Sequence, residues 1–249
     1  MEASKDGQTP PPNRTVTRGS PEWPAAMQSL RDLPPSPRRL ALFRVADGIR
    51  GILHRMVQTS APIDVIEAAA QDLEEVEERF SAYSHTSMYE GFAESANAGE
   101  SFAFFDHSPM LGRANPLAPP IELWLEEDHI AGRAIFGPAY EGPPGCVHGG
   151  YIAAAFDEVL GSTQSLSGAP GMTGRLTVNY RRPTPLEAEL RFVGYLESVN
   201  GRKILTRAEL WAGEVLCAEA EGLFISMQDG RLADMVVERN EKQAGPTES

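Results

Sequence analysis

Cysteine is scarce in this sequence, with only Cys146 and Cys217 among 249 residues. Two cysteines are too few for a disulfide framework, so we expect both to be reduced, partly buried thiols. The histidines offer no obvious metal site either, since they are scattered and have neither a cysteine pair nor HExxH spacing beside them. They include His85, His107, His129 and His148.

The chain also lacks an excess of positive charge and any long apolar run. Its formal net charge is −13 and its pI is about 4.9. This balance argues against a nucleic-acid binder, because neutralising phosphates requires a cationic face. No apolar run is long enough to span a membrane, and the first residues, MEASKDGQTPPPNRT, have no apolar signal region. We therefore expect a cytoplasmic protein.

What the chain does contain is enough apolar residues, 41%, to build a packed core. Changes in composition along the sequence predict five segments. Residues 1–36 are proline-rich and form a disordered tail, and residues 37–85 form a helical hairpin. Residues 86–117 are a linker, residues 118–228 are a globular domain, and residues 229–249 are a flexible tail.

The predicted hairpin combines a basic helix and an acidic helix. Residues 38–59 repeat apolar side chains at steps of three and four and are rich in arginine, whereas the helix expected after Pro62 is rich in aspartate and glutamate. Opposite charges on consecutive helices predict a hairpin with complementary faces. Alternatively, the basic helix docks on a membrane or an anionic partner, or the pair is a DNA-reading helix-turn-helix. The acidic second helix argues against both alternatives, because it can neutralise the first helix.

The domain after residue 118 predicts an α+β fold. Residues 121–125 and 130–136 are typical of two strands, and residues 148–161 form a helix that is apolar around its whole circumference and therefore buried. Four further strands follow as a meander at residues 175–180, 188–196, 203–210 and 215–224, with a hairpin signal at Asn200-Gly201. This order predicts one antiparallel sheet wrapped around one long central helix, with an N-terminal helical extension.

The candidate site is His148-Gly149-Gly150, at the start of this helix, together with Asp157. The glycines allow close approach to the backbone, and the first helical turn presents unpaired N–H groups. Because the helix is apolar all round, we expect Asp157 to be buried, where it either serves chemistry or caps a neighbouring loop. Asp157 stands roughly 13 Å from His148 along the axis, at 1.5 Å per residue. The spacing thus predicts a site shared between two subunits.

The stretches HGGYIAAAFDEVLG and GMTGRLTVNYRRPTPL resemble the hotdog-fold acyl-CoA thioesterases. The resemblance covers roughly residues 118–227 and is closest to the phenylacetate-pathway and mammalian thioesterase-superfamily-member enzymes. It implies that Asp157 is the general base or nucleophile and that the amide of Gly149 or Gly150 donates to the oxyanion. It also implies that His148 orients the loop or contacts the thioester.

The resemblance extends to residues beyond the helix. It implies that Thr173 helps to position water and that Asn179, Arg181 and Arg182 lie near the phosphates of coenzyme A. Some relatives carry an asparagine about six residues before the histidine as an extra oxyanion donor. This chain has Gly142 there, so we expect its oxyanion hole to consist of backbone N–H groups.

The implied function is hydrolysis of acyl-CoA to a free acid and coenzyme A, as in fatty acid metabolism. No metal or redox cofactor is expected, since coenzyme A enters only as part of the substrate. The implied assembly is a homodimer or a homotetramer made of two dimers. One alternative is a hotdog hydratase, whose relatives place a histidine five positions after the aspartate, where this chain has Ser162. The other is a non-catalytic acyl-CoA sensor regulated by residues 38–84.

Overall fold

The chain is described by a computed structural model over residues 35–83, 103–169 and 171–226. The N-terminal elements are α2 (Pro37–Met56), α3 (Ile63–Ser81) and α5 (Ala103–Asp106). The domain contains β1 (Glu122–Glu126), β2 (His129–Ile135), η1 (Pro138–Tyr140), α6 (Gly149–Gln164), η2 (Ser165–Ser167), β3 (Gly171–Tyr180), β4 (Glu189–Asn200), β5 (Lys203–Ala212) and β6 (Val215–Ser226). The predicted tails at 1–36 and 229–249 lie outside the described residues, apart from residues 35 and 36.

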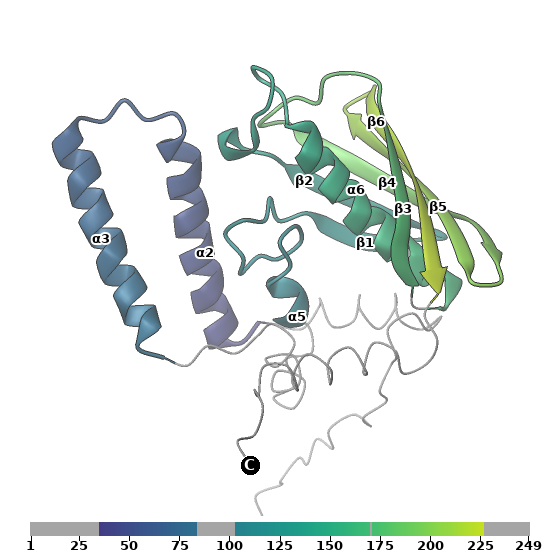
Figure 1. The fold of residues 1–249 in the computed structure, drawn as a ribbon, viewed down its shortest axis with the longest axis horizontal. Coiled ribbons are helices and arrows are strands. Elements are labelled where there is room, and N and C mark those ends of the chain that lie inside the picture. Colours follow the sequence, from purple (N-terminus) through teal and green to yellow (C-terminus); the bar gives the residue numbers. More distant parts are fainter. Residues whose placement is uncertain (1–34, 84–102, 170, 227–249) are drawn as a thin grey trace, which may run out of the picture.

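The domain is one six-stranded antiparallel sheet with α6 lying across it (Figure 1). The strand order is β1-β2-β4-β5-β6-β3, and α6 contacts every strand from β2 to β6. Each predicted strand and the predicted central helix are present, so the predicted fold class is confirmed. The Asn200-Gly201 turn also forms as expected, with Gly201 in the left-handed region at φ 57°.

The prediction of a four-strand meander is wrong in one respect. β4, β5 and β6 pair consecutively, but β3 pairs with β6 and forms the outer edge of the sheet, while β4 pairs with β2. Alternating side chains mark each strand but do not record which strand lies beside it. The consequence matters for the site, because β3 is a ten-residue edge strand.

The core forms between α6 and the inner face of the sheet. Phe156 of α6 packs edge-to-face on Phe192 of β4, with ring centroids 5.9 Å apart, and both side chains are fully buried. Cys217 is buried in the same core and Cys146 is half-buried, and both are free thiols as predicted. Because α6 is apolar on most sides, it is stabilised by packing against the sheet, which contacts it from β2 to β6.

α2 packs against the domain through one side. Phe43, Ala46 and Arg50 are buried. Arg39 forms an ion pair with Asp106 at 2.7 Å, and the Arg50 guanidinium donates to the carbonyl of Ala118 at 2.8 Å. The segment that receives α2 belongs to the predicted linker. Met110 of this segment is buried in the core of the domain. The end of the predicted linker is therefore packed against the domain and provides carbonyl groups that Arg50 of α2 contacts.

α3 lies beside α2 in the chain but buries nothing (Figure 1). Within residues 35–83, no ion pair joins the two helices, although α2 is basic and α3 is acidic. The two helices are therefore present as predicted, but complementary faces within one chain are not in contact. None of the described helices is long and apolar enough to cross a membrane.

Candidate active site

His148 caps the N-terminus of α6. Its backbone is extended, at φ −62° and ψ 132°, and its Nδ1 accepts the N–H of Gly150 at 3.0 Å. Its own N–H donates to the carbonyl of Tyr140 at 2.9 Å. The imidazole is thus used to fix the turn that begins the helix, which agrees with the loop-orienting role implied for it.

The two glycine amides after His148 differ in what they can still bind. The Gly150 N–H is taken by His148, whereas the Gly149 N–H has no acceptor among the described residues. Such an N–H, at the positive end of a helix, is suited to an incoming anion or a polarised carbonyl oxygen. Of the two donors that the resemblance allowed, the geometry favours Gly149.

Gly142 lies directly against His148. A Cβ built at position 142 would come within 2.8 Å of the His148 Cα, which is closer than a side chain tolerates next to a backbone atom. An asparagine at this position would therefore require the backbone to move. The close contact with His148 therefore disfavours a side-chain donor at position 142, and an oxyanion hole made of backbone N–H groups stays a prediction.

Asp157 is positioned by Thr173. The threonine hydroxyl on β3 donates to Asp157 Oδ1 at 2.8 Å. The expectation that Asp157 is buried is wrong for a single chain, because the side of α6 that carries it lies next to the open edge at β3 and both residues are exposed. The neighbouring Glu158 points elsewhere, as predicted, and accepts the Ser108 hydroxyl at 3.3 Å.

Tyr180 is a site residue that sequence reasoning missed. Its hydroxyl donates to the carbonyl of Gly149 at 2.8 Å. Thr173 and Tyr180 are seven positions apart, which would place them on opposite faces of a regular strand. A β-bulge between Thr173 and Arg175 shifts the alternation, so both side chains face α6. The bulge leaves only a weak sequence signal, the glycine at position 174.

The two halves of the site lie at different points along α6. The Gly149 N–H and the Asp157 carboxylate are separated by roughly 12 Å of helix. Both are exposed to solvent or only half-buried, and both are touched by the same edge strand, β3. Within one chain, the Gly149 N–H and the Asp157 carboxylate are therefore too far apart to act on one small carbonyl group.

The three residues predicted to contact coenzyme A, Asn179, Arg181 and Arg182, differ in their position on the sheet and in their present partners. Asn179 pairs with Glu219 on the face of the sheet opposite to Tyr180. Arg181 already forms an ion pair with Glu219 at 2.5 Å, whereas the exposed Arg182 side chain has no partner among the described residues. Arg182 is thus the most available of the three for a phosphate.

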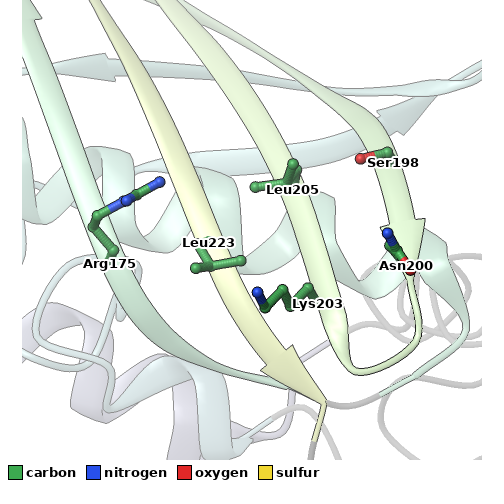
Figure 2. Close-up of a pocket in the computed structure, with 6 residues that line it drawn as sticks. All are labelled: Arg175, Ser198, Asn200, Lys203, Leu205 and Leu223. Atoms are coloured by element: carbon green, nitrogen blue, oxygen red, sulfur yellow. The ribbon is translucent and has the colours of Figure 1, made fainter.

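A hollow on the outer face of the sheet is separate from this site. It has a volume of about 330 Å³, and its lining side chains, drawn in Figure 2, belong to the adjacent strands β4, β5, β6 and β3. The lining residues are Arg175, Ser198, Asn200, Lys203, Leu205 and Leu223. Register places Arg175 opposite Leu223, whose neighbour Phe224 faces α6, so the hollow opens away from Asp157.

The loop behind His148 is held by α2. The Ala139 N–H donates to His54 Nδ1 at 3.2 Å, and the Tyr140 hydroxyl donates to the carbonyl of Leu117 at 3.0 Å. Burial, with the nearby Arg50 guanidinium, lowers the pKa of His54 below its usual 6.5, which keeps the imidazole neutral and able to accept. Burial likewise raises the pKa of Tyr140 to about 12, so its hydroxyl remains a donor.

Three comparisons with known proteins address the family. The sequence profile of the thioesterase superfamily matches residues 144–218. A solved thioesterase superfamily protein, RHA08564, is 32% identical, covers 78% of this chain and 94% of its own, and superposes with a TM-score of 0.66. This chain belongs to the thioesterase superfamily. The resemblance inferred from the sequence is confirmed, and the matched segment contains His148, Gly149 and Asp157.

Two curated members of the thioesterase superfamily align over the same part of the chain. The acyl-coenzyme A thioesterase THEM4 of Xenopus laevis is 37% identical over 93 residues, which are 36% of this chain and 42% of that protein. The acyl-coenzyme A thioesterase THEM5 of Homo sapiens is 28% identical over 94 residues, 37% of this chain and 38% of that protein. The chain therefore spans about two-fifths of the length of these curated relatives.

The described part of this superfamily member has no set of side chains suited to binding a metal ion. No grouping of three or more His, Cys, Asp and Glu side chains in residues 35–83, 103–169 and 171–226 could hold one. Within these ranges, the candidate groups for the site are the Asp157–Thr173 pair and the capped N-terminus of α6.

Proposed function

We propose that this chain is an acyl-CoA thioesterase that hydrolyses acyl-CoA to a free acid and coenzyme A. The observation that carries the proposal is the pair of exposed groups on α6, a Gly149 N–H without an acceptor among the described residues and an Asp157 carboxylate held by Thr173. The curated relatives, which are named acyl-coenzyme A thioesterases, support the substrate class.

The active site forms between two copies of the chain through the β3 edge. β3 contacts Asp157 through Thr173 near one end and Gly149 through Tyr180 at the other. If two copies of β3 pair antiparallel about a two-fold axis near Leu176 and Thr177, Thr173 of one copy lies opposite Tyr180 of the other. The Asp157 of each copy then approaches the Gly149 of the other, and pairing satisfies the open strand edge.

Each active site uses the Gly149 N–H of one copy and the Asp157 carboxylate of the other. The Gly149 N–H of one copy donates a hydrogen bond to the thioester carbonyl oxygen and stabilises the negative charge that develops on it. The Asp157 carboxylate of the other copy removes a proton from water that attacks the carbonyl carbon, or attacks that carbon itself. In the first route the carbon–sulfur bond breaks and the proton passes to the leaving thiolate, which gives the free acid and coenzyme A. In the second route coenzyme A leaves as a thiolate that takes a proton from water, and a further water hydrolyses the acyl–aspartate anhydride to the free acid and the restored carboxylate.

The remaining groups position the substrate. Arg182, followed by Asn179 and Arg181, is the proposed contact for the phosphates of coenzyme A, and no metal or redox cofactor is required for this chemistry. The homodimer, its association into a dimer of dimers and a cytoplasmic location are parts of the same proposal. They rest on the intersubunit geometry and on the sequence.

The test is thiol release from a panel of short, medium, long-chain and aromatic acyl-CoAs. Wild type should turn over at least one class, and Asp157→Asn should lose at least about 10²-fold, as expected for a general base. Glu158→Gln is the matched control, because this adjacent carboxylate faces Ser108 instead, and it should keep wild-type turnover. If acyl-CoA binds stoichiometrically to wild type but no thiol is released, the chain is a sensor and the hydrolase proposal fails.

A further inference from the structure

α3 carries an apolar stripe that no described residue of the same chain buries. Val65, Ile66, Leu73 and Phe80 are between 40 and 52% exposed, and no residue of this nineteen-residue helix is buried. Ile66, Leu73 and Phe80 stand seven positions apart, which aligns them along one side of the helix. A single helix of this length is only marginally stable in water, so its stripe needs a partner surface.

α2 carries a second apolar stripe on the side turned away from the domain. Val45, Ile52 and Met56 are exposed there, whereas Phe43, Ala46 and Arg50 bury the opposite side. Val45 and Ile52 are again seven positions apart. The exposed arginines of α2 that neither pair with Asp106 nor reach the loop carbonyls are Arg38, Arg44 and Arg55.

The charges of the two helices are opposite. α2 contains five arginines and one aspartate, while α3 contains seven acidic residues and one arginine. Two copies of α3 would therefore repel each other, whereas α3 against α2 combines apolar stripes with opposite charges. Within one chain this pairing is not made, since α3 buries no residue and no described ion pair joins it to α2.

We infer that the α3 stripe packs on the outer stripe of α2 in a second copy of this chain. The exchange is reciprocal under two-fold symmetry, so each copy gives its α3 and receives the other's. The residues that anchor α2 to its own domain, Arg39 and Arg50, are not used by the exchange. The inference does not depend on catalysis, because neither stripe includes a residue of the candidate active site.

Two charge-reversed variants distinguish packing of α3 on α2 of a second copy from packing of α3 on α2 of the same chain. In the first, Arg38→Glu, Arg44→Glu and Arg55→Glu make α2 acidic. In the second, Asp72→Lys, Glu74→Lys, Glu77→Lys and Glu78→Lys make α3 basic. Each chain alone pairs like charges, both within itself and with a second copy of itself. Only a mixture of the two chains offers opposite charges at both α2–α3 contacts.

The readout is hydrogen exchange of the amides in residues 63–81, followed by mass spectrometry on full-length, co-expressed or singly expressed chains. Wild type should protect these amides, and each reversed chain alone should lose at least about tenfold of that protection, because several opposite-charge pairs become like-charge pairs. Co-expression should restore it in both chains. Arg175→Glu with Lys203→Glu, on the outer face of the sheet, is the control charge reversal and should leave α3 protected.

Three results would overturn the inference. In the first, wild-type α3 exchanges at the rate of an unprotected chain, which would mean that no second copy covers it; this measurement needs no variant. In the second, a reversed chain alone remains as protected as wild type. In the third, co-expression fails to restore protection, as it would if α3 closed on α2 of its own chain. Loss of turnover in these variants would not bear on the inference, and loss of turnover in Asp157→Asn would not either.

Discussion

α6 and α3 are helices of similar length with opposite surroundings. α6 has 16 residues and buries seven of them against five strands, whereas α3 has 19 residues and buries none. α3 was predicted from its apolar spacing after Pro62, and α6 from a stretch that is apolar on nearly every side. The difference teaches that periodicity identifies a helix but not what covers it, because the cover is supplied by other parts of the chain or by another copy.

α2 lies between these extremes. One side is fixed to the domain by Phe43, Arg39 and Arg50, and the other remains exposed. It also reaches the loop behind the candidate site through His54 and Ala139. The helical extension is therefore a packed part of the molecule up to α2 and an unsupported one at α3.

The contrast between the buried helix α6 and the exposed helix α3 is tested most strongly by replacing one phenylalanine in each helix with alanine. Phe156→Ala should lower the free energy of unfolding by about 3–5 kcal/mol, because the ring is fully buried against Phe192. Phe80→Ala should leave the unfolding of the sheet unchanged and reduce hydrogen-exchange protection of α3 only. Urea unfolding followed by tryptophan fluorescence measures the first effect. Equal losses from the two variants would mean that α3 belongs to the core.

The attachment of α2 is tested through its ion pair with the domain. Arg39→Ala leaves Asp106, whose side chain is 7% exposed, without its guanidinium partner, so we expect a loss of about 3 kcal/mol in unfolding free energy. The double variant Arg39→Met, Asp106→Leu should recover most of that loss, since no charge remains buried. Urea unfolding of wild type, Arg39→Ala and the double variant gives both values. A loss that persists undiminished in the double variant would assign the effect to packing.

Tyr180 links the sheet edge to the start of α6 and should affect turnover more than stability. Tyr180→Phe removes the hydrogen bond to the Gly149 carbonyl, worth about 0.5–1.5 kcal/mol, so kcat should fall by up to about tenfold. KM and the thermal midpoint should stay close to wild type if the hydroxyl only orients the Gly149 turn. A rise in KM without a fall in kcat would instead place Tyr180 in substrate binding.

The smallest expected effect is the pH dependence of the α2 attachment. Since the pKa of His54 is lowered by burial, the folded chain holds it neutral while the unfolded chain protonates it near 6.5. The unfolded state binds more protons below that value, so the stabilising contribution is present above pH 6.5 and is lost as the pH falls toward the folded pKa. Thermal midpoints between pH 8 and pH 5 should fall less steeply for His54→Gln than for wild type. Identical slopes would contradict the role of His54.

Much of the fold was accessible from the sequence because local chemistry specifies it. Alternation marked the six strands, the Asn200-Gly201 pair marked a hairpin, and the all-round apolar stretch after His148 marked a helix that packs against a sheet. Strand order was not accessible, since the place of β3 beside β6 depends on contacts distant in sequence. The open β3 edge that exposes Asp157 could therefore not be foreseen.

The candidate site was predicted in part for the same reason. His148, Gly149, Gly150, Asp157 and Thr173 belong to short motifs, and the structure brings Thr173 to Asp157 and His148 to Gly150. Tyr180 was missed because the bulge after Thr173 reverses the side-chain alternation along β3. The choice between Gly149 and Gly150 as donor required knowing where the His148 ring points.

The most direct test of the shared active site is complementation between two inactive chains. Asp157→Asn removes the carboxylate, and Gly149→Pro removes the N–H at the first helical position, where proline is tolerated and where His148 already has the extended backbone that proline requires. Each variant alone should be inactive. Mixed and reassembled in equal amounts, they should recover about a quarter of wild-type thiol release, because half of the dimers are mixed and each has one intact site. No activity in the mixture, with mixed dimers shown to form, would contradict a site built from two copies.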